Sequence, residues 1–86
     1  MVSYDYSGRD VVKAMVNSSV SWVPERQTGS HMILKWEPPD DHRESEPRTV
    51  SIPNHNSIPR GTLKGISEDA GADDLDKFCM WIESNL

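Results

Sequence analysis

The sequence predicts an α+β fold of the order α-β-β-β-α-α, in which helices cover one face of a three-stranded antiparallel sheet. Apolar residues recur at helical spacing near the N-terminus, three short segments of alternating apolar and polar residues occupy the middle, and two further helical patterns follow. Short antiparallel strands with helices gathered on one face form an α+β sandwich.

The first element is a helix over residues 8–17. Ser7 and Asp10 have the spacing of a capping box, in which Ser7 accepts a backbone N–H and Asp10 lies at the positive end of the helix. The turn-prone residues 17–19 end it. One face of this helix is expected to be apolar and consists of Val11, Val12, Met15 and Val16.

Three strands follow this helix. The first covers residues 21–27 and contains Pro24, which cannot donate to a ladder and therefore favours an edge strand or a bulge. A turn at residues 28–30 leads to the second strand, residues 31–36, and the third covers residues 48–52. Alternation places on the core side Met32, Leu34, Trp36, Val50 and Ile52. It places on the accessible side His31, Ile33, Lys35, Thr49 and Ser51.

The remaining segments are one loop and two helices. Residues 37–47 contain three prolines and five acidic residues and are expected to form a mobile loop. Pro59 suits the first turn of a helix that Gly71 ends, with a buried stripe of Leu63, Ile66 and Ala70. The last helix begins at about Asp73 and is expected to bury Leu75, Phe78 and Ile82.

The length and composition fit one small domain, residues 1–86, in the cytoplasm. A chain of 86 residues can bury only a thin core. Cys79 is the only cysteine, so no internal disulfide forms and a reducing compartment is expected. No segment approaches the roughly 20 apolar residues of a membrane span, and no leader pattern is present, so no membrane association is expected.

The charge is unevenly distributed. A net charge of −5 argues against a general nucleic-acid binder, because phosphate affinity depends on lysine and arginine. The acids, however, are concentrated in residues 37–46, with five against one base, and in residues 67–86, with six against one. Residues 47–66 carry three bases and no acid, so a local cationic face can still attract a polyanion.

Four short motifs occur in order along the chain: residues 26–31 (RQTGSH), 52–55 (IPNH), 60–64 (RGTLK) and 70–78 (AGADDLDKF). Together they resemble the HicA family of small mRNA interferase toxins, and the resemblance is collinear from about Ser7 to Ile82. It implies a fold like the double-stranded RNA-binding domain and an endoribonuclease that cleaves mRNA without a metal or cofactor. It also implies a HicB-like antitoxin as the protein partner.

His31 is the candidate catalytic residue. A histidine at a strand start, beside a flexible glycine and a hydroxyl, is placed for proton transfer near neutral pH. RNA supplies its own nucleophile, the 2′-hydroxyl, so an acid–base group and donors to the phosphate are sufficient. The resemblance assigns this role to His31, whereas its spacing alone is also explained by a surface histidine that only caps the strand.

Each of the other candidates has both a functional and a structural interpretation. Gly29 and Ser30 can present donors to a phosphate or simply form the turn. His55 can be a second acid–base group, a phosphate donor or a structural residue. The expected phosphate contacts, each of which is otherwise an ordinary solvated cation, are Arg26, Lys35, Arg60 and Lys64. The three tryptophans can stack on bases or belong to the core.

A metal site is not expected. The three histidines, His42 among them, lack the spacing of zinc ligands with one another or with the cysteine. The acidic loop and the long first connection depart from the compact family pattern. The sequence therefore leaves open a non-catalytic RNA-binding module whose histidines only contact the backbone, and a plain protein-interaction domain that does not associate with RNA.

Overall fold

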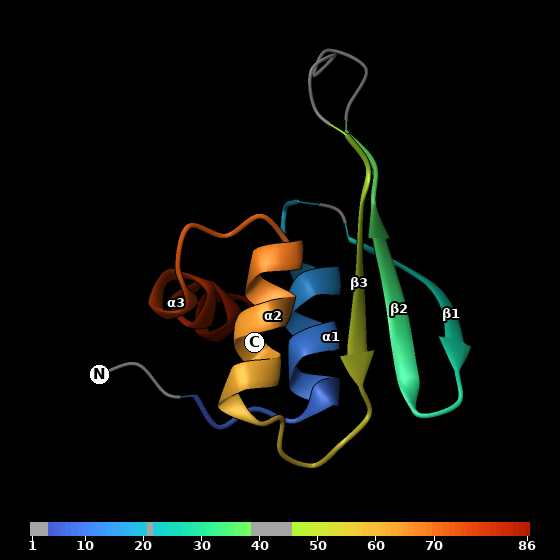
Figure 1. Ribbon diagram of the computed structural model, residues 1–86. Coiled ribbons are helices and arrows are strands. Elements are labelled where there is room, and N and C mark those ends of the chain that lie inside the picture. Colours follow the sequence, from blue (N-terminus) through green and yellow to red (C-terminus); the bar gives the residue numbers. More distant parts are fainter. Residues whose placement is uncertain (1–3, 21, 39–45) are drawn as a thin grey trace.

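The computed structural model describes residues 4–20, 22–38 and 46–86. Its elements are α1 (Gly8–Asn17), β1 (Val23–Thr28), β2 (His31–Trp36), β3 (Arg48–Pro53), α2 (Arg60–Asp69) and α3 (Leu75–Asn85) (Figure 1). This order confirms the predicted α+β class, and α1 and β2 have the predicted bounds. Most of the expected mobile loop, at positions 39–45, lies outside the described residues.

The strands form one antiparallel sheet of order β1-β2-β3. A two-residue loop joins β1 to β2, so that Thr28 lies opposite His31, and His31 in turn lies opposite Pro53 of β3. The pairing of β1 with β2 shifts between Pro24 and Arg26. The prediction drawn from Pro24 is confirmed on both counts, because β1 is an edge strand and carries this irregularity.

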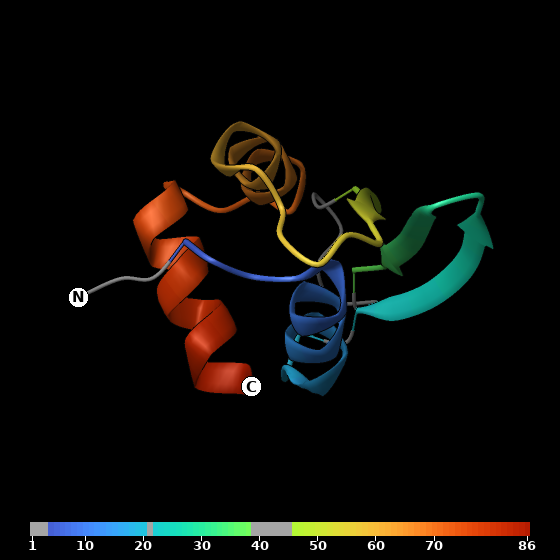
Figure 2. The ribbon, with the colours of Figure 1, turned by 90° about the horizontal axis from the view of Figure 1, so that it is seen from below.

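The molecule has three layers. Helices α1 and α2 pack against β3 on one face of the sheet, and α3 packs on α1 and α2 rather than on the strands (Figures 1 and 2). The opposite face of the sheet, called the outer face from here on, is covered by none of the described elements (Figure 2). None of the described helices is both long enough and apolar enough to span a bilayer.

The core lies between the sheet and the helices. Its fully buried side chains include Val11, Met15, Leu34, Val50, Ile52, Leu63 and Ile82. One expectation for α1 was wrong: Val16 is 41% exposed, and Ala14 is buried instead. The positions around the helix axis explain this difference. Val16 lies about 140° from the buried Val11, whereas Ala14 lies only about 60° from it and therefore shares its buried face.

Helix α1 begins directly against the end of β3. The predicted capping box is present: the Asp10 N–H donates to the Ser7 hydroxyl and the Ser7 N–H donates to the Asp10 carboxylate, both at 3.1 Å. Gly8 is buried, and a Cβ there would lie 2.1 Å from the Pro53 carbonyl oxygen. Only glycine therefore allows this close approach of helix and strand.

Two N-terminal tyrosines attach α3. The Tyr6 hydroxyl donates to the Glu83 carboxylate at 2.9 Å and lies 3.3 Å from the Cys79 carbonyl oxygen. Tyr4 donates to the Asp76 carboxylate. Burial, followed by the hydrogen bond to Glu83, raises the pKa of Tyr6 well above its ordinary value, and burial likewise raises the pKa of the Cys79 thiol.

Candidate active site

The β1–β2 hairpin holds the first predicted motif at one end of the sheet. Gly29 has φ +57°, in the left-handed region that favours glycine at the first position of a two-residue hairpin loop. A Cβ at this position would meet nothing within 4 Å, so the backbone conformation rather than crowding requires the glycine. The loop ends at His31, whose side chain lies on the outer face and is exposed.

The second histidine lies at the same end of the molecule. The Asn54 N–H donates to the Ser30 carbonyl oxygen at 2.6 Å, which ties the hairpin loop to the segment after β3. The His55 carbonyl oxygen accepts from the Gly8 N–H at 2.9 Å. Both His31 and His55 are exposed, and neither imidazole has a hydrogen-bond partner within the part of the chain that the structure describes. Two imidazoles are thus available to a ligand at this end.

Arg26 is a cation beside His31 on the outer face. It lies opposite Ile33, so it is the diagonal neighbour of His31 across the β1–β2 pair. Diagonal neighbours on one face of a sheet are about 7–8 Å apart, within reach of a long side chain. Among residues 4–20, 22–38 and 46–86, Arg26 has no ion-pair partner, so its guanidinium can pair with an anion beside His31.

Lys35 lies farther along the same face, four positions from His31. Its ammonium pairs with the Glu37 carboxylate at 3.1 Å. A hollow of about 400 Å³ lies beside it and is lined by Val23, Pro24, Glu25, Lys35 and Glu37. Because two carboxylates line this hollow, phosphate is less favoured there than beside Arg26.

Arg60 and Lys64 are not brought together with His31. Both lie on α2, which covers the face of the sheet opposite to the outer face (Figure 2). The Arg60 guanidinium lies 3.7 Å from the ring centroid of Tyr4, and the Tyr4 hydroxyl in turn donates to the carboxylate of Asp76 in α3. Lys64 is exposed on the helix surface. The four predicted phosphate contacts are therefore divided between two sides of the molecule.

A comparison with known families decides the identity. The model of the family described as the HicA toxin of bacterial toxin–antitoxin systems matches residues 8–72, which is most of the chain. The chain belongs to the HicA toxin family. No curated protein and no solved structure matches it. The matched residues of this HicA toxin include the hairpin, both exposed histidines and α2, whereas α3 lies outside them.

Sequence reasoning missed one residue at the candidate site of the toxin. Thr28 faces His31 directly across the hairpin, and both side chains lie on the outer face. Directly opposite residues have Cβ atoms about 4.5–5.5 Å apart, so the Thr28 hydroxyl lies within reach of a group bound to His31. The sequence could have indicated this pair, because the two residues that flank a two-residue hairpin loop lie opposite each other.

The described residues contain no group of three histidine, cysteine, aspartate or glutamate side chains placed to hold a metal ion. The groups that the candidate site presents to a ligand are the imidazoles of His31 and His55, the Thr28 hydroxyl and the Arg26 guanidinium.

Proposed function

We propose that this HicA toxin is an endoribonuclease that cleaves mRNA without a metal ion, with His31 as its acid–base residue. The main support is the exposed and unpartnered imidazole at the hairpin end, with Arg26 and Thr28 beside it on the same face. A histidine can transfer the protons of an RNA transesterification near neutral pH, and the cation and the hydroxyl beside it can hold the phosphate.

In the proposed reaction the RNA supplies the nucleophile. The 2′-oxygen attacks the adjacent phosphorus as its proton is removed, and the bond from phosphorus to the 5′-oxygen breaks as that oxygen gains a proton. The products are a 2′,3′-cyclic phosphate and a 5′-hydroxyl. His31 performs one of the two proton transfers, and His55, exposed at the same end, is the candidate for the other.

The phosphate is proposed to lie over the hairpin. Arg26 and the Thr28 hydroxyl would contact its non-bridging oxygens, with the backbone N–H groups of Gly29 and Ser30 as further donors. Lys35, whose ammonium also pairs with Glu37, is proposed as a weaker contact to the RNA farther along the outer face. Arg60 and Lys64 are left out of this site because they lie on the helical side.

The surface charge supports RNA as the substrate despite the net charge of −5. Six acidic residues lie in residues 67–86, which form the end of α2, the connection to α3 and α3 itself, away from the outer face (Figure 2). The proposed protein partner is a HicB-like antitoxin that covers the hairpin end, in the cytoplasm. Such a cover would exclude RNA from His31.

Expression of the toxin in a bacterial host tests this proposal. The wild-type chain is expected to arrest growth and fragment transcripts, and His31→Ala is expected to permit growth at an equal protein level. Lys77→Ala changes an exposed cation of α3 and is expected to remain toxic. A His31→Ala protein as toxic as the wild type would refute the catalytic role. Intact transcripts together with RNA binding in vitro would indicate a non-catalytic RNA-binding module.

A further inference from the structure

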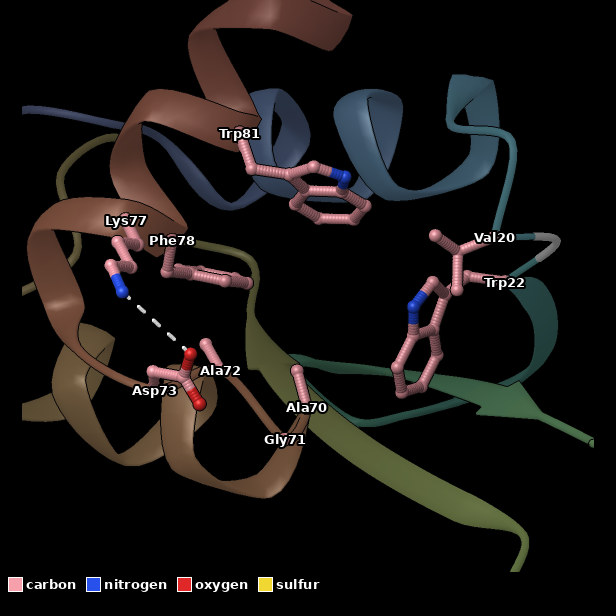
Figure 3. Close-up of a pocket in the computed structure, with 9 residues that line it drawn as sticks. All are labelled: Val20, Trp22, Ala70, Gly71, Ala72, Asp73, Lys77, Phe78 and Trp81. Atoms are coloured by element: carbon pink, nitrogen blue, oxygen red, sulfur yellow. Dashed lines mark ion pairs between the residues drawn. The ribbon is translucent and has the colours of Figure 1, made fainter. Parts of the chain in front are cut away.

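An aromatic pocket is lined by the segment before β1, the α2–α3 connection and α3, at the end of the molecule opposite to the loop of the β1–β2 hairpin (Figures 1 and 3). It has a volume of about 260 Å³. The rings of Trp22, Phe78 and Trp81 surround the open space, with Ala70 and Ala72 beside them (Figure 3). The family match ends at residue 72 and so assigns no role to the α3 side of this pocket.

The pocket has the size and walls of a site for one large apolar side chain. Its volume is below the roughly 300–1,000 Å³ of pockets that enclose whole small molecules. Phe78 and Trp81 pack with ring centroids 5.8 Å apart, which gives a rigid wall. Val20 lines the pocket and is 40% exposed, so apolar surface reaches solvent there. Pockets of this kind receive the anchor residues of protein–protein interfaces.

The charges around the pocket favour a basic ligand. Five acidic residues lie in or next to the α2–α3 connection: Glu68, Asp69, Asp73, Asp74 and Asp76. Three cations lie near these acids: Lys77 pairs with Asp73 at 3.7 Å, the Arg48 guanidinium lies against Gly71, and Arg60 lies over the ring of Tyr4, which donates to Asp76. Acids therefore outnumber bases, so a phosphate backbone is repelled and lysine or arginine is attracted.

We propose that this pocket docks a protein segment that carries a phenylalanine or other large apolar anchor flanked by lysine or arginine. The anchor fills the space between Trp22 and Trp81, and the flanking cations face the carboxylates of the α2–α3 connection. A nucleobase is the competing occupant for an aromatic pocket, and the surrounding carboxylates disfavour it. The proposal does not depend on RNA cleavage, because the pocket lies at the other end of the molecule from His31.

NMR titration of the full ¹⁵N-labelled chain with the peptide acetyl-Lys-Lys-Phe-Lys-Lys-amide tests the proposal. The indole N–H signals of Trp22 and Trp81 are expected to shift with saturation, while that of Trp36, which does not line the pocket, stays in place. Replacement of the peptide phenylalanine by alanine, or of its lysines by glutamates, is expected to raise the Kd at least tenfold.

Two variants of the chain locate the binding. Val20→Lys places a cation at the pocket and is expected to weaken the lysine peptide at least tenfold with the rest of the spectrum unchanged. Val23→Lys is the matched control, because Val23 is an exposed valine that does not line this pocket. The proposal is overturned if the peptide causes no saturable shift, if the alanine peptide binds equally well, or if a uridine decanucleotide shifts Trp22 and Trp81 instead.

Discussion

At the scale of single residues, the exposure of His31 follows from the two-residue loop that precedes it. The left-handed φ of Gly29 turns the chain back on itself, and strand alternation then points His31, Ile33 and Lys35 to the outer face. These features could be predicted from the sequence because they depend only on neighbours along the chain. The side of the molecule on which Arg60 and Lys64 lie could not, because it depends on how α2 packs on the sheet.

A measurement of RNA affinity tests whether the RNA contacts the cations of the outer face or those of α2. In a His31→Ala background, Arg26→Ala is expected to weaken binding of single-stranded RNA and to make the slope of log K against log salt shallower by about 0.7, the value for one lost phosphate contact. Lys64→Ala is the matched control, an exposed cation on α2, and is expected to leave the slope unchanged. Fluorescence anisotropy at several salt concentrations measures both. An equal loss in the two variants would show that the RNA contacts both sides alike and would contradict the proposed site, and a loss confined to Lys64→Ala would place the RNA on the helical side.

At the scale of secondary-structure elements, the contact between α1 and β3 fixes the arrangement of the site. Gly8 packs on the Pro53 carbonyl and donates to His55, so the start of α1 positions the segment that carries the second histidine. The sequence indicated where α1 begins, through its capping box. It did not indicate why position 8 is glycine, because the crowding atoms come from residues 53 and 54, far along the chain.

Two glycine-to-alanine substitutions test this contact. Gly8→Ala is expected to destabilise the fold by about 1–3 kcal/mol, since the new methyl group forces α1 away from β3. Gly65→Ala is the matched control: nothing lies within 4 Å of its Cβ position, and it lies inside α2. It is expected to stabilise the fold by about 0.5–1 kcal/mol, through the better helix propensity of alanine. Urea unfolding followed by tryptophan fluorescence measures both changes, and equal effects would contradict the account.

At the scale of the whole molecule, α3 forms a third layer that the sequence patterns did not reveal. Its apolar stripe predicted a helix and the burial of Phe78 and Ile82, which the structure confirms. A stripe alone does not say whether it packs on a sheet or on other helices. Here the partners are α1 and α2, and the attachment is completed by Tyr4 and Tyr6 at the other end of the chain.

Stability is expected to fall in alkaline solution. The pKa values of Tyr6 and Cys79 are raised in the folded state, so above their ordinary values of 10.0 and 9.0 the unfolded chain loses protons that the folded chain keeps. Stability from these groups is therefore full below about pH 8 and decreases as the pH rises through 9.0 and 10.0. Tyr6→Phe removes one of the groups and is expected to show a shallower decline in Tm. A decline as steep as that of the wild type would exclude Tyr6 as a source.

The rate at which His31→Ala cleaves RNA is the most direct test of the proposed chemistry. Wild type and variant are compared under single-turnover conditions on one single-stranded RNA, with EDTA present. The wild type is expected to yield 2′,3′-cyclic phosphate ends, the variant to be slower by about 10²–10⁴-fold, and both to leave the 2′-O-methyl form of the RNA intact. Equal rates for the two proteins, or cleavage of the 2′-O-methyl RNA, would contradict the account.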